Sequence, residues 1–167
     1  MKRDLLRLKA KARELGAVEA KLIKASTIKT AAWVRMKCQY GCSGYGSNLC
    51  CPPHTPTPQQ TQQVIDCYTT ALLVHCRPGA DPTDIVVSLE REAFLAGYYK
   101  AWGLGAGPCF SCKTCNLKKC VKQDKTRPSM ESCGIDVYAT ARANRFPIEV
   151  VKHDTSPQNY YGLLLIE

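Results

Sequence analysis

The sequence lacks the long apolar runs that export and membrane insertion require. No stretch approaches the roughly 20 apolar residues of a membrane-spanning helix. The first residues, Met-Lys-Arg-Asp-Leu-Leu-Arg-Leu-Lys, contain no unbroken apolar segment of the kind found in signal peptides. We therefore expect a cytoplasmic protein that does not enter a membrane.

Histidine is scarce, and the common catalytic and nucleotide-binding motifs are missing. The chain has 3 histidines, His54, His75 and His153. None of them belongs to a Ser-His-Asp or Cys-His pattern typical of nucleophilic catalysis. There is no P-loop, and the glycines of segment 103–107 do not complete a dinucleotide-binding fingerprint. The sequence identifies no catalytic residue, so whether the protein is an enzyme stays open.

Aromatic residues make up only 8% of the chain, and Tyr40 and Tyr45 are too scattered to form a base-stacking surface. Nucleic-acid binding is therefore not expected, although the formal net charge is +9. Two thiolate-bound iron–sulfur clusters would lower that charge to roughly +5. The remaining positive charge favours an acidic protein partner.

Cysteine, in contrast, is abundant. The chain contains 11 cysteines among 167 residues, and an odd number excludes complete pairing in disulfides. A chain of this length can bury a core without covalent cross-links. In a reducing compartment, dense cysteine indicates metal or redox chemistry. Cys67 and Cys76 are expected to be small buried residues that bind no metal.

The most informative motif is the stretch Gly-Pro-Cys-Phe-Ser-Cys-Lys-Thr-Cys-Asn-Leu-Lys-Lys-Cys, which contains Cys109, Cys112, Cys115 and Cys120. The C-x2-C-x2-C spacing lets one loop reach three corners of a cubane iron–sulfur cluster, and Cys120 is the best fourth ligand. Structural zinc is the alternative, but zinc usually takes two C-x2-C pairs separated by a longer spacer. We predict a [4Fe-4S] cluster here, with nearby lysines able to dock an acidic redox partner.

An earlier, less regular group comprises Cys38, Cys42, Cys50 and Cys51. We predict a second iron–sulfur cluster at this group, with a zinc site as the alternative. Adjacent side chains point apart in most backbones, so Cys50 and Cys51 are not expected to bind the same ion together. The fourth ligand is left open among Cys50, Cys133 and His54.

The periodicity of the chain predicts helices over residues 3–15, from residue 58, and over 81–101 and 135–143, and strands over 17–24, 70–76, 148–152 and 160–166. Segment 26–56 shows no regular pattern, and we expect bound metal to order it. This order favours an α+β fold, an α/β sandwich with a sheet of about four strands and helices mainly on one face. We expect a single metal-binding domain over residues 1–167, with cysteine-rich loops at about 38–54 and 105–133.

Three motifs together resemble a family of predicted metal-binding proteins of unknown function. They are Cys-Pro-Pro after the paired cysteines, Gly-Pro-Cys-x-x-Cys-x-x-Cys, and Arg-Pro-Ser-Met-Glu-x-x-Gly-Ile-Asp-Val. The resemblance spans nearly the whole chain and implies a small cytoplasmic iron–sulfur or metal protein of prokaryotes, chiefly anaerobes. It places the ligands of the family on Cys38, Cys42, Cys51, Cys109, Cys112, Cys115 and Cys120. Cys50 and Cys133 lie outside that pattern, and Val121-Lys122-Gln123 departs from the arginine and proline usual there.

These observations predict an iron–sulfur protein with one or two [4Fe-4S] clusters and an electron-transfer or redox accessory role. One alternative is a cluster-dependent enzyme in which an iron keeps an open position for a small substrate. Another is a zinc-stabilised binding module. The motif at 127–137 is expected to be a structural latch that positions the cysteine loop, rather than a catalytic segment acting through Glu131 or Asp136.

Overall fold

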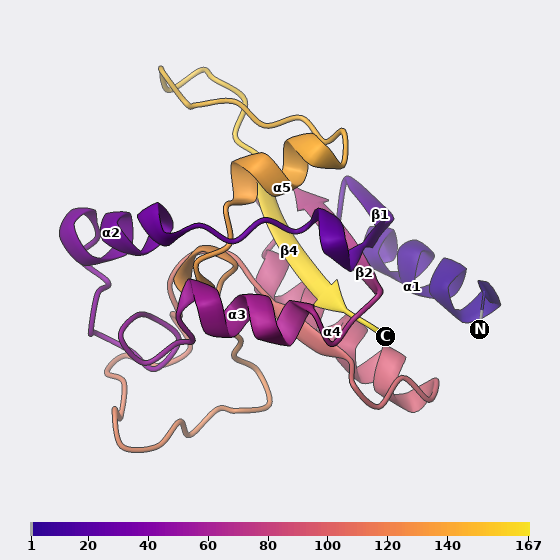
Figure 1. Ribbon diagram of the computed structural model, residues 1–167, viewed down its shortest axis with the longest axis horizontal. Coiled ribbons are helices and arrows are strands. Elements are labelled where there is room, and N and C mark those ends of the chain that lie inside the picture. The colour runs from indigo at the N-terminus through magenta and orange to yellow at the C-terminus, as the bar shows by residue number, and fades with distance from the viewer. Residues whose placement is uncertain (1) are drawn as a thin grey trace.

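The computed structural model describes residues 2–167 (Figure 1). Its helices are α1 (Lys2–Glu14), α2 (Ala32–Gly41), α3 (Pro58–Ile65), α4 (Pro82–Leu95) and α5 (Val137–Ala143), with 3-10 turns at Ala25–Thr27 and Glu131–Cys133. Its strands are β1 (Glu19–Lys24), β2 (Thr70–Cys76), β3 (Trp102–Leu104) and β4 (Tyr160–Leu165). They form a 4-stranded antiparallel sheet in the order β1-β2-β4-β3. The predicted α+β class is therefore confirmed. None of the described helices is long and apolar enough to cross a membrane.

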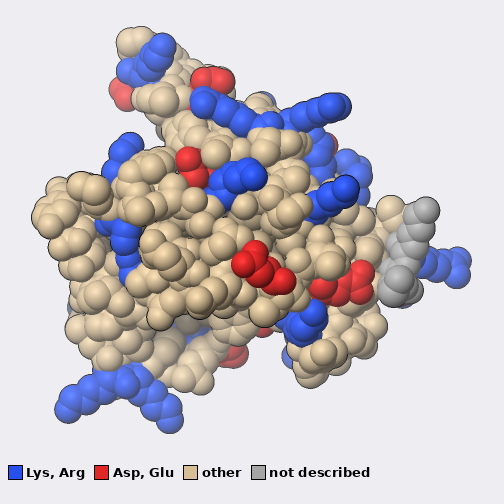
Figure 2. Space-filling model, viewed as in Figure 1, with Lys and Arg blue, Asp and Glu red and all other residues tan. Residues whose placement is uncertain are grey.

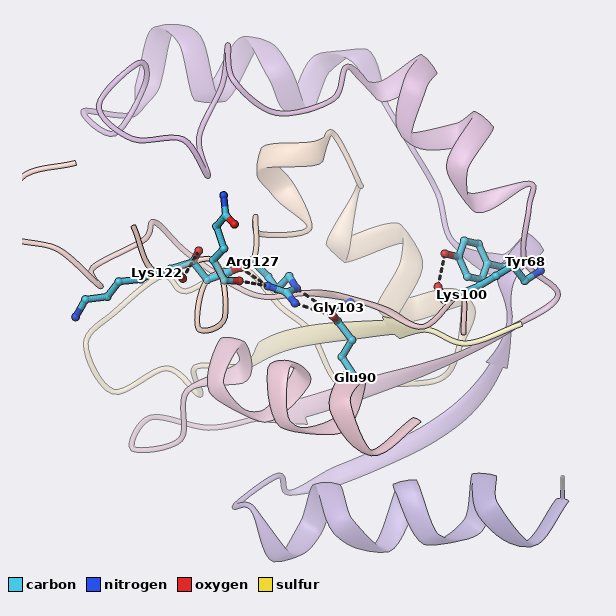
Figure 3. A network of polar contacts seen from close by, with 8 residues as sticks. Tyr68, Glu90, Lys100, Gly103, Lys122 and Arg127 are labelled. Carbon is cyan, nitrogen blue, oxygen red and sulfur yellow. Dashed lines mark hydrogen bonds and ion pairs between the residues drawn. The ribbon is translucent and has the colours of Figure 1, made fainter. Parts of the chain in front are cut away.

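The pleat of the sheet divides its apolar side chains between two cores. Leu72, Val74 and Leu164 pack on the face covered by α1 and α4. Leu73 and Leu163 pack on the opposite face, against residues of α3, α5 and the segment before α5. Figure 3 shows α1 and α4 together on one side of the sheet. The two longest helices thus share one face, but the shorter helices cover the other, so the helices are less one-sided than the sequence predicted.

The fourth strand of the sheet comes from an unexpected segment. Helix α4 ends at Leu95 because Gly97 adopts a left-handed conformation with φ of 99°. The segment that follows Gly97 forms β3, which pairs with β4. The strand predicted at 148–152 is wrong. Ile148 is buried there, but segment 148–152 forms no strand, and the place beside β4 is taken by β3 instead.

The expected irregular segment 26–56 contains helix α2. Val34 is the only fully buried residue of this helix, so the helix shows almost no apolar periodicity. Arg35 fixes the helix instead, because its guanidinium donates to the Thr55 hydroxyl at 2.8 Å and to the Ser132 carbonyl at 2.6 Å. These bonds hold the helix that carries Cys38 against the turn before α5.

The latch predicted at 127–137 makes hydrogen bonds consistent with that role. Gly105 donates its N–H to the Pro128 carbonyl at 2.9 Å, and Met130 donates to the Gly105 carbonyl at 3.0 Å. The two ends of the cysteine loop are thereby held together. Gly105 needs to lack a side chain, since a Cβ there would lie 2.9 Å from the Cβ of Thr83 on α4.

Candidate metal centre

The two cysteine-rich loops lie side by side, although about 60 residues separate them in the sequence (Figure 1). They enclose a small cavity of about 20 Å³. The thiols in its lining are Cys50, Cys109, Cys112, Cys115 and Cys120, all of them half-buried. The structure therefore adds Cys50, from the earlier loop, to the four cysteines of the central motif. We call these five residues the central group.

Cys38, Cys42 and Cys51 form a separate cluster, which we call the first group. Gly44 lies between two of them, because a Cβ at Gly44 would be 3.5 Å from the Cys42 sulfur and 3.7 Å from the Cys51 sulfur. Burial raises the pKa of the Cys38 thiol, and the neighbouring Cys42 raises it further. Cys38 therefore lies within electrostatic reach of the other two thiols. Its sulfur is 4.0 Å from the Glu131 carbonyl oxygen.

Cys109 connects the two groups. It stands beside Cys50, whose pKa is raised to about 12 by burial and then by the charge and hydrogen bond of Cys109. The backbone of Cys109 also interacts with Cys51 and opposes the rise in pKa that burial causes there. The adjacent residues Cys50 and Cys51 thus lie in different groups, because neighbouring side chains point apart. Thiols this crowded and buried resist joint ionisation unless a cation binds them.

Cys133 and His54, the other proposed fourth ligands, do not belong to the central group, although the His54 N–H donates to the Cys51 carbonyl at 3.0 Å. Cys133 is buried in the hydrophobic core beside Met130 and Ile135, and His54 is exposed. Neither residue lines the small cavity of the central group. Cys76 is buried as expected, whereas Cys67 is exposed, contrary to the prediction. All 11 cysteines are free thiols in the structure.

The donor set of the central group fits a thiophilic metal. The described residues that line the small cavity include five cysteines but no carboxylate or histidine. Within residues 2–167, no three Cys, His, Asp or Glu side chains stand close enough together to hold a single metal ion as they lie. The cavity of about 20 Å³ has room for one ion or one water. A cubane is larger, so its insertion requires the half-exposed cysteine loop to move outward.

Three polar groups support the sulfurs and were not identified from the sequence. The Asn48 amide donates to the Cys51 sulfur at 3.3 Å, while its oxygen accepts from the Cys50 N–H at 3.0 Å. Gly44 donates its N–H to the Cys42 sulfur at 3.4 Å. The Thr126 hydroxyl lies 3.5 Å from the sulfur of the last cysteine in the central motif. Asparagine and glycine near paired cysteines indicate turns, but they do not reveal which sulfur a turn will contact.

Comparison with known proteins gives a match at the level of a family. No curated protein and no solved structure matched the chain. A family model described as "Predicted metal-binding protein (DUF2284)" matches residues 21–166, a span that includes both cysteine groups. The match confirms the family resemblance seen in the motifs. Because it covers most of the sequence, the chain belongs to this family of predicted metal-binding proteins.

Proposed function

We propose that this protein binds one or two [4Fe-4S] clusters through its cysteine groups and acts as an electron carrier or redox accessory protein in the cytoplasm. The observation that carries the proposal is the cavity of the central group, where thiols from two distant segments meet and the part of the chain that the structure describes contributes no carboxylate or histidine. All-thiolate ligation with C-x2-C-x2-C spacing is typical of iron–sulfur proteins. A bound cluster would supply one-electron redox chemistry.

Each cysteine group has a role in this proposal. Cys112, Cys115 and Cys120 would hold one centre together with Cys50 or Cys109, and the first group would hold the other. Cys109 is suited to complete either set, because it interacts with both Cys50 and Cys51. The donors at Asn48 and Gly44 would lower the negative charge on the first-group sulfurs. Such bonds raise the reduction potential of a thiolate-bound centre.

Zinc remains the alternative metal. The volume of the small cavity favours a single ion, whereas the spacing of the thiols does not. The small cavity has about the volume of one ion. Tetrahedral zinc, however, brings its sulfurs to about 3.8 Å from one another, since each Zn–S bond is about 2.3 Å. Within residues 2–167, no three cysteines stand close enough together to hold one such ion as they lie. A cubane spreads its ligands over four irons, so we favour the cluster.

Redox bleaching tests the proposal. Protein purified without oxygen is expected to be brown, with visible absorption that dithionite bleaches and reoxidation restores. Colourless protein that contains stoichiometric zinc would instead support a zinc-stabilised binding module. Iron that is bound but cannot be reduced would contradict the electron-transfer role.

The lysines around the central group supply a docking surface for an acidic redox partner. They are exposed and comprise Lys113, Lys118, Lys119, Lys122 and Lys125. Figure 2 shows basic side chains projecting at the lower left, where this loop lies in Figure 1. Asp124 is the only acid of segment 109–127. Opposite charges on two surfaces accelerate encounter, and salt screens the effect.

Reversal of two of these charges is expected to slow electron exchange. The double variant Lys118→Glu and Lys119→Glu should reduce the rate with an acidic ferredoxin by about tenfold or more at low ionic strength. Stopped-flow absorption would measure it over a series of salt concentrations. The matched control is Arg7→Glu with Arg13→Glu, which makes the same change in net charge on α1. Equal electron-exchange rates for the two double variants would show that the lysines around the central group are not a docking surface.

A further inference from the structure

A second, much larger cavity lies beside the first cysteine group. Its volume is about 970 Å³, close to the upper end of the roughly 300–1,000 Å³ range of small-molecule sites. Helix α2, the N-termini of α4 and α5, segment 106–110 and the chain before β4 form its walls. Cys38 and Cys42 lie in that wall. A molecule bound there would therefore contact the first group, whereas the thiols of the central group line the separate small cavity.

The walls of this cavity expose aromatic rings. Trp33, Phe110, Tyr138 and Tyr160 line it, and their exposed fractions run from 36% to 86%. The Tyr160 hydroxyl is already bonded to Gln158 at 2.7 Å, so its ring face, rather than its polar end, is available to a ligand. An apolar surface of this kind, left open to water, is typical of a binding site. The rings favour a flat molecule that can stack or lie edge-on.

The charged residues of the lining set the charge of that molecule. Acids outnumber bases, with Asp81, Glu131, Asp136 and Glu149 against Lys37. The Lys37 ammonium is directed over the Trp33 ring, 5.2 Å from its centroid. An iron–sulfur cluster bound at the first group would add further negative charge. The electrostatic balance therefore disfavours an anionic ligand.

One of the lining residues, Glu131, has a carboxyl oxygen that lacks a partner. The Oε2 atom of Glu131 is buried and makes no hydrogen bond among the described residues. Most other carboxyl groups of the lining are engaged. Asp81 accepts from the Thr83 N–H at 2.7 Å, and Asp136 accepts from the Ala139 N–H at 2.9 Å. This atom is enclosed by protein, so a ligand in the cavity is held by the aromatic walls and the other acids of the lining.

We propose that the larger cavity binds a flat organic ligand that carries an amine or ring nitrogen and is positively charged or neutral. The ligand lies between the aromatic walls and the thiols of the first group. Stacking and cation–π contacts hold its ring system, and the acidic lining selects against carboxylates and phosphates. This inference adds a small-molecule site to the proposed redox protein, and the site exists whichever metal the cysteines hold.

Equilibrium dialysis with two bicyclic probes of matched size tests the inference. N-methylquinolinium carries a positive charge and naphthalene-2-carboxylate a negative one. The purified protein is expected to bind one quinolinium per chain and to bind it at least about tenfold more tightly than the carboxylate, as one or two cation–π contacts imply. Equal affinity for both probes, or no binding of either at millimolar concentration, would overturn it.

The two tryptophans of the chain provide a matched pair of variants. Trp33 lines the cavity, whereas Trp102 lies on β3 and is not part of the lining. Trp33→Leu should weaken quinolinium binding about tenfold, while Trp102→Leu should leave it unchanged. If both variants bind like the original protein, the ligand does not occupy this cavity. Iron content is measured on the same samples. A variant that loses probe binding but retains its iron has a changed cavity and an intact metal site, so the two proposals are tested separately.

Discussion

Replacement of Cys112 and Cys115 by serine is expected to remove about four iron atoms per chain and leave about four, if each cysteine group holds its own cubane. Both residues line the small cavity, whose described lining contains none of Cys38, Cys42 and Cys51. Loss of two ligands leaves at most three thiols around that cavity, which is too few to hold a cubane with all four irons ligated. The first group keeps Cys38, Cys42 and Cys51 and can recruit Cys109.

Iron and acid-labile sulfide, measured on anaerobically purified variants, would report this loss. Cys67→Ser is the matched control, because Cys67 is exposed and its thiol lies 3.4 Å from the Gln63 carbonyl, away from both groups. That variant should retain all of the metal. Complete loss of iron from the double variant would show that the cysteines form one centre rather than two, and full retention would exclude the central group as a metal site.

Arg127→Ala is expected to destabilise the protein by about 3–5 kcal/mol, the range for breaking a buried ion pair from one side. The Arg127 guanidinium donates two hydrogen bonds to Glu90 on α4, at 2.8 and 2.6 Å (Figure 3). The side chains are only 12% and 14% exposed. Its remaining nitrogen donates to the carbonyls of Gln123 and Thr126 at 2.8 and 2.7 Å. One side chain therefore joins the end of the cysteine loop to the core.

The same substitution should also weaken metal retention by the central group. Glu90 would keep its bond from the Gly103 N–H at 2.7 Å but would lose its cation, and the loop end beside Cys120 would lose its anchor. Denaturant unfolding and iron content would measure the two effects. Arg142→Ala is the control, because the Arg142–Glu149 pair is 54% and 86% exposed and its loss should cost less than about 1 kcal/mol. A similar cost for both variants would contradict the structural role of Arg127.

The sequence predicted those elements whose signals are local and chemical. The start of α3 is an example: Thr57 accepts from the Gln60 N–H at 3.2 Å, and Gln60 accepts in return from the Thr57 N–H at 2.8 Å. The apolar run of β2 likewise predicted a buried strand. Helix α2 was missed because an arginine, rather than an apolar stripe, fixes it. Strand β3 was missed because Trp102, Gly103 and Leu104 are too few to show a period.

The cysteine site was predicted in composition but not in arrangement. Spacing alone grouped Cys50 with its sequence neighbours, whereas the fold places it in the cavity of the central motif. The position of Cys50 depends on how the two cysteine-rich loops pack together. A local sequence pattern carries no information about that packing. Asn48, which the sequence did not single out, is 6% exposed and contacts Cys51 for the same reason. The large cavity depends on segments from most of the chain and has no sequence signature.

The most direct test is the content of iron and acid-labile sulfide in the intact protein purified without oxygen. One cubane predicts about four atoms of each per chain, and two predict about eight. Equal iron and sulfide near either value would support the account. Protein that contains neither element, and holds zinc or no metal at its cysteines, would contradict it.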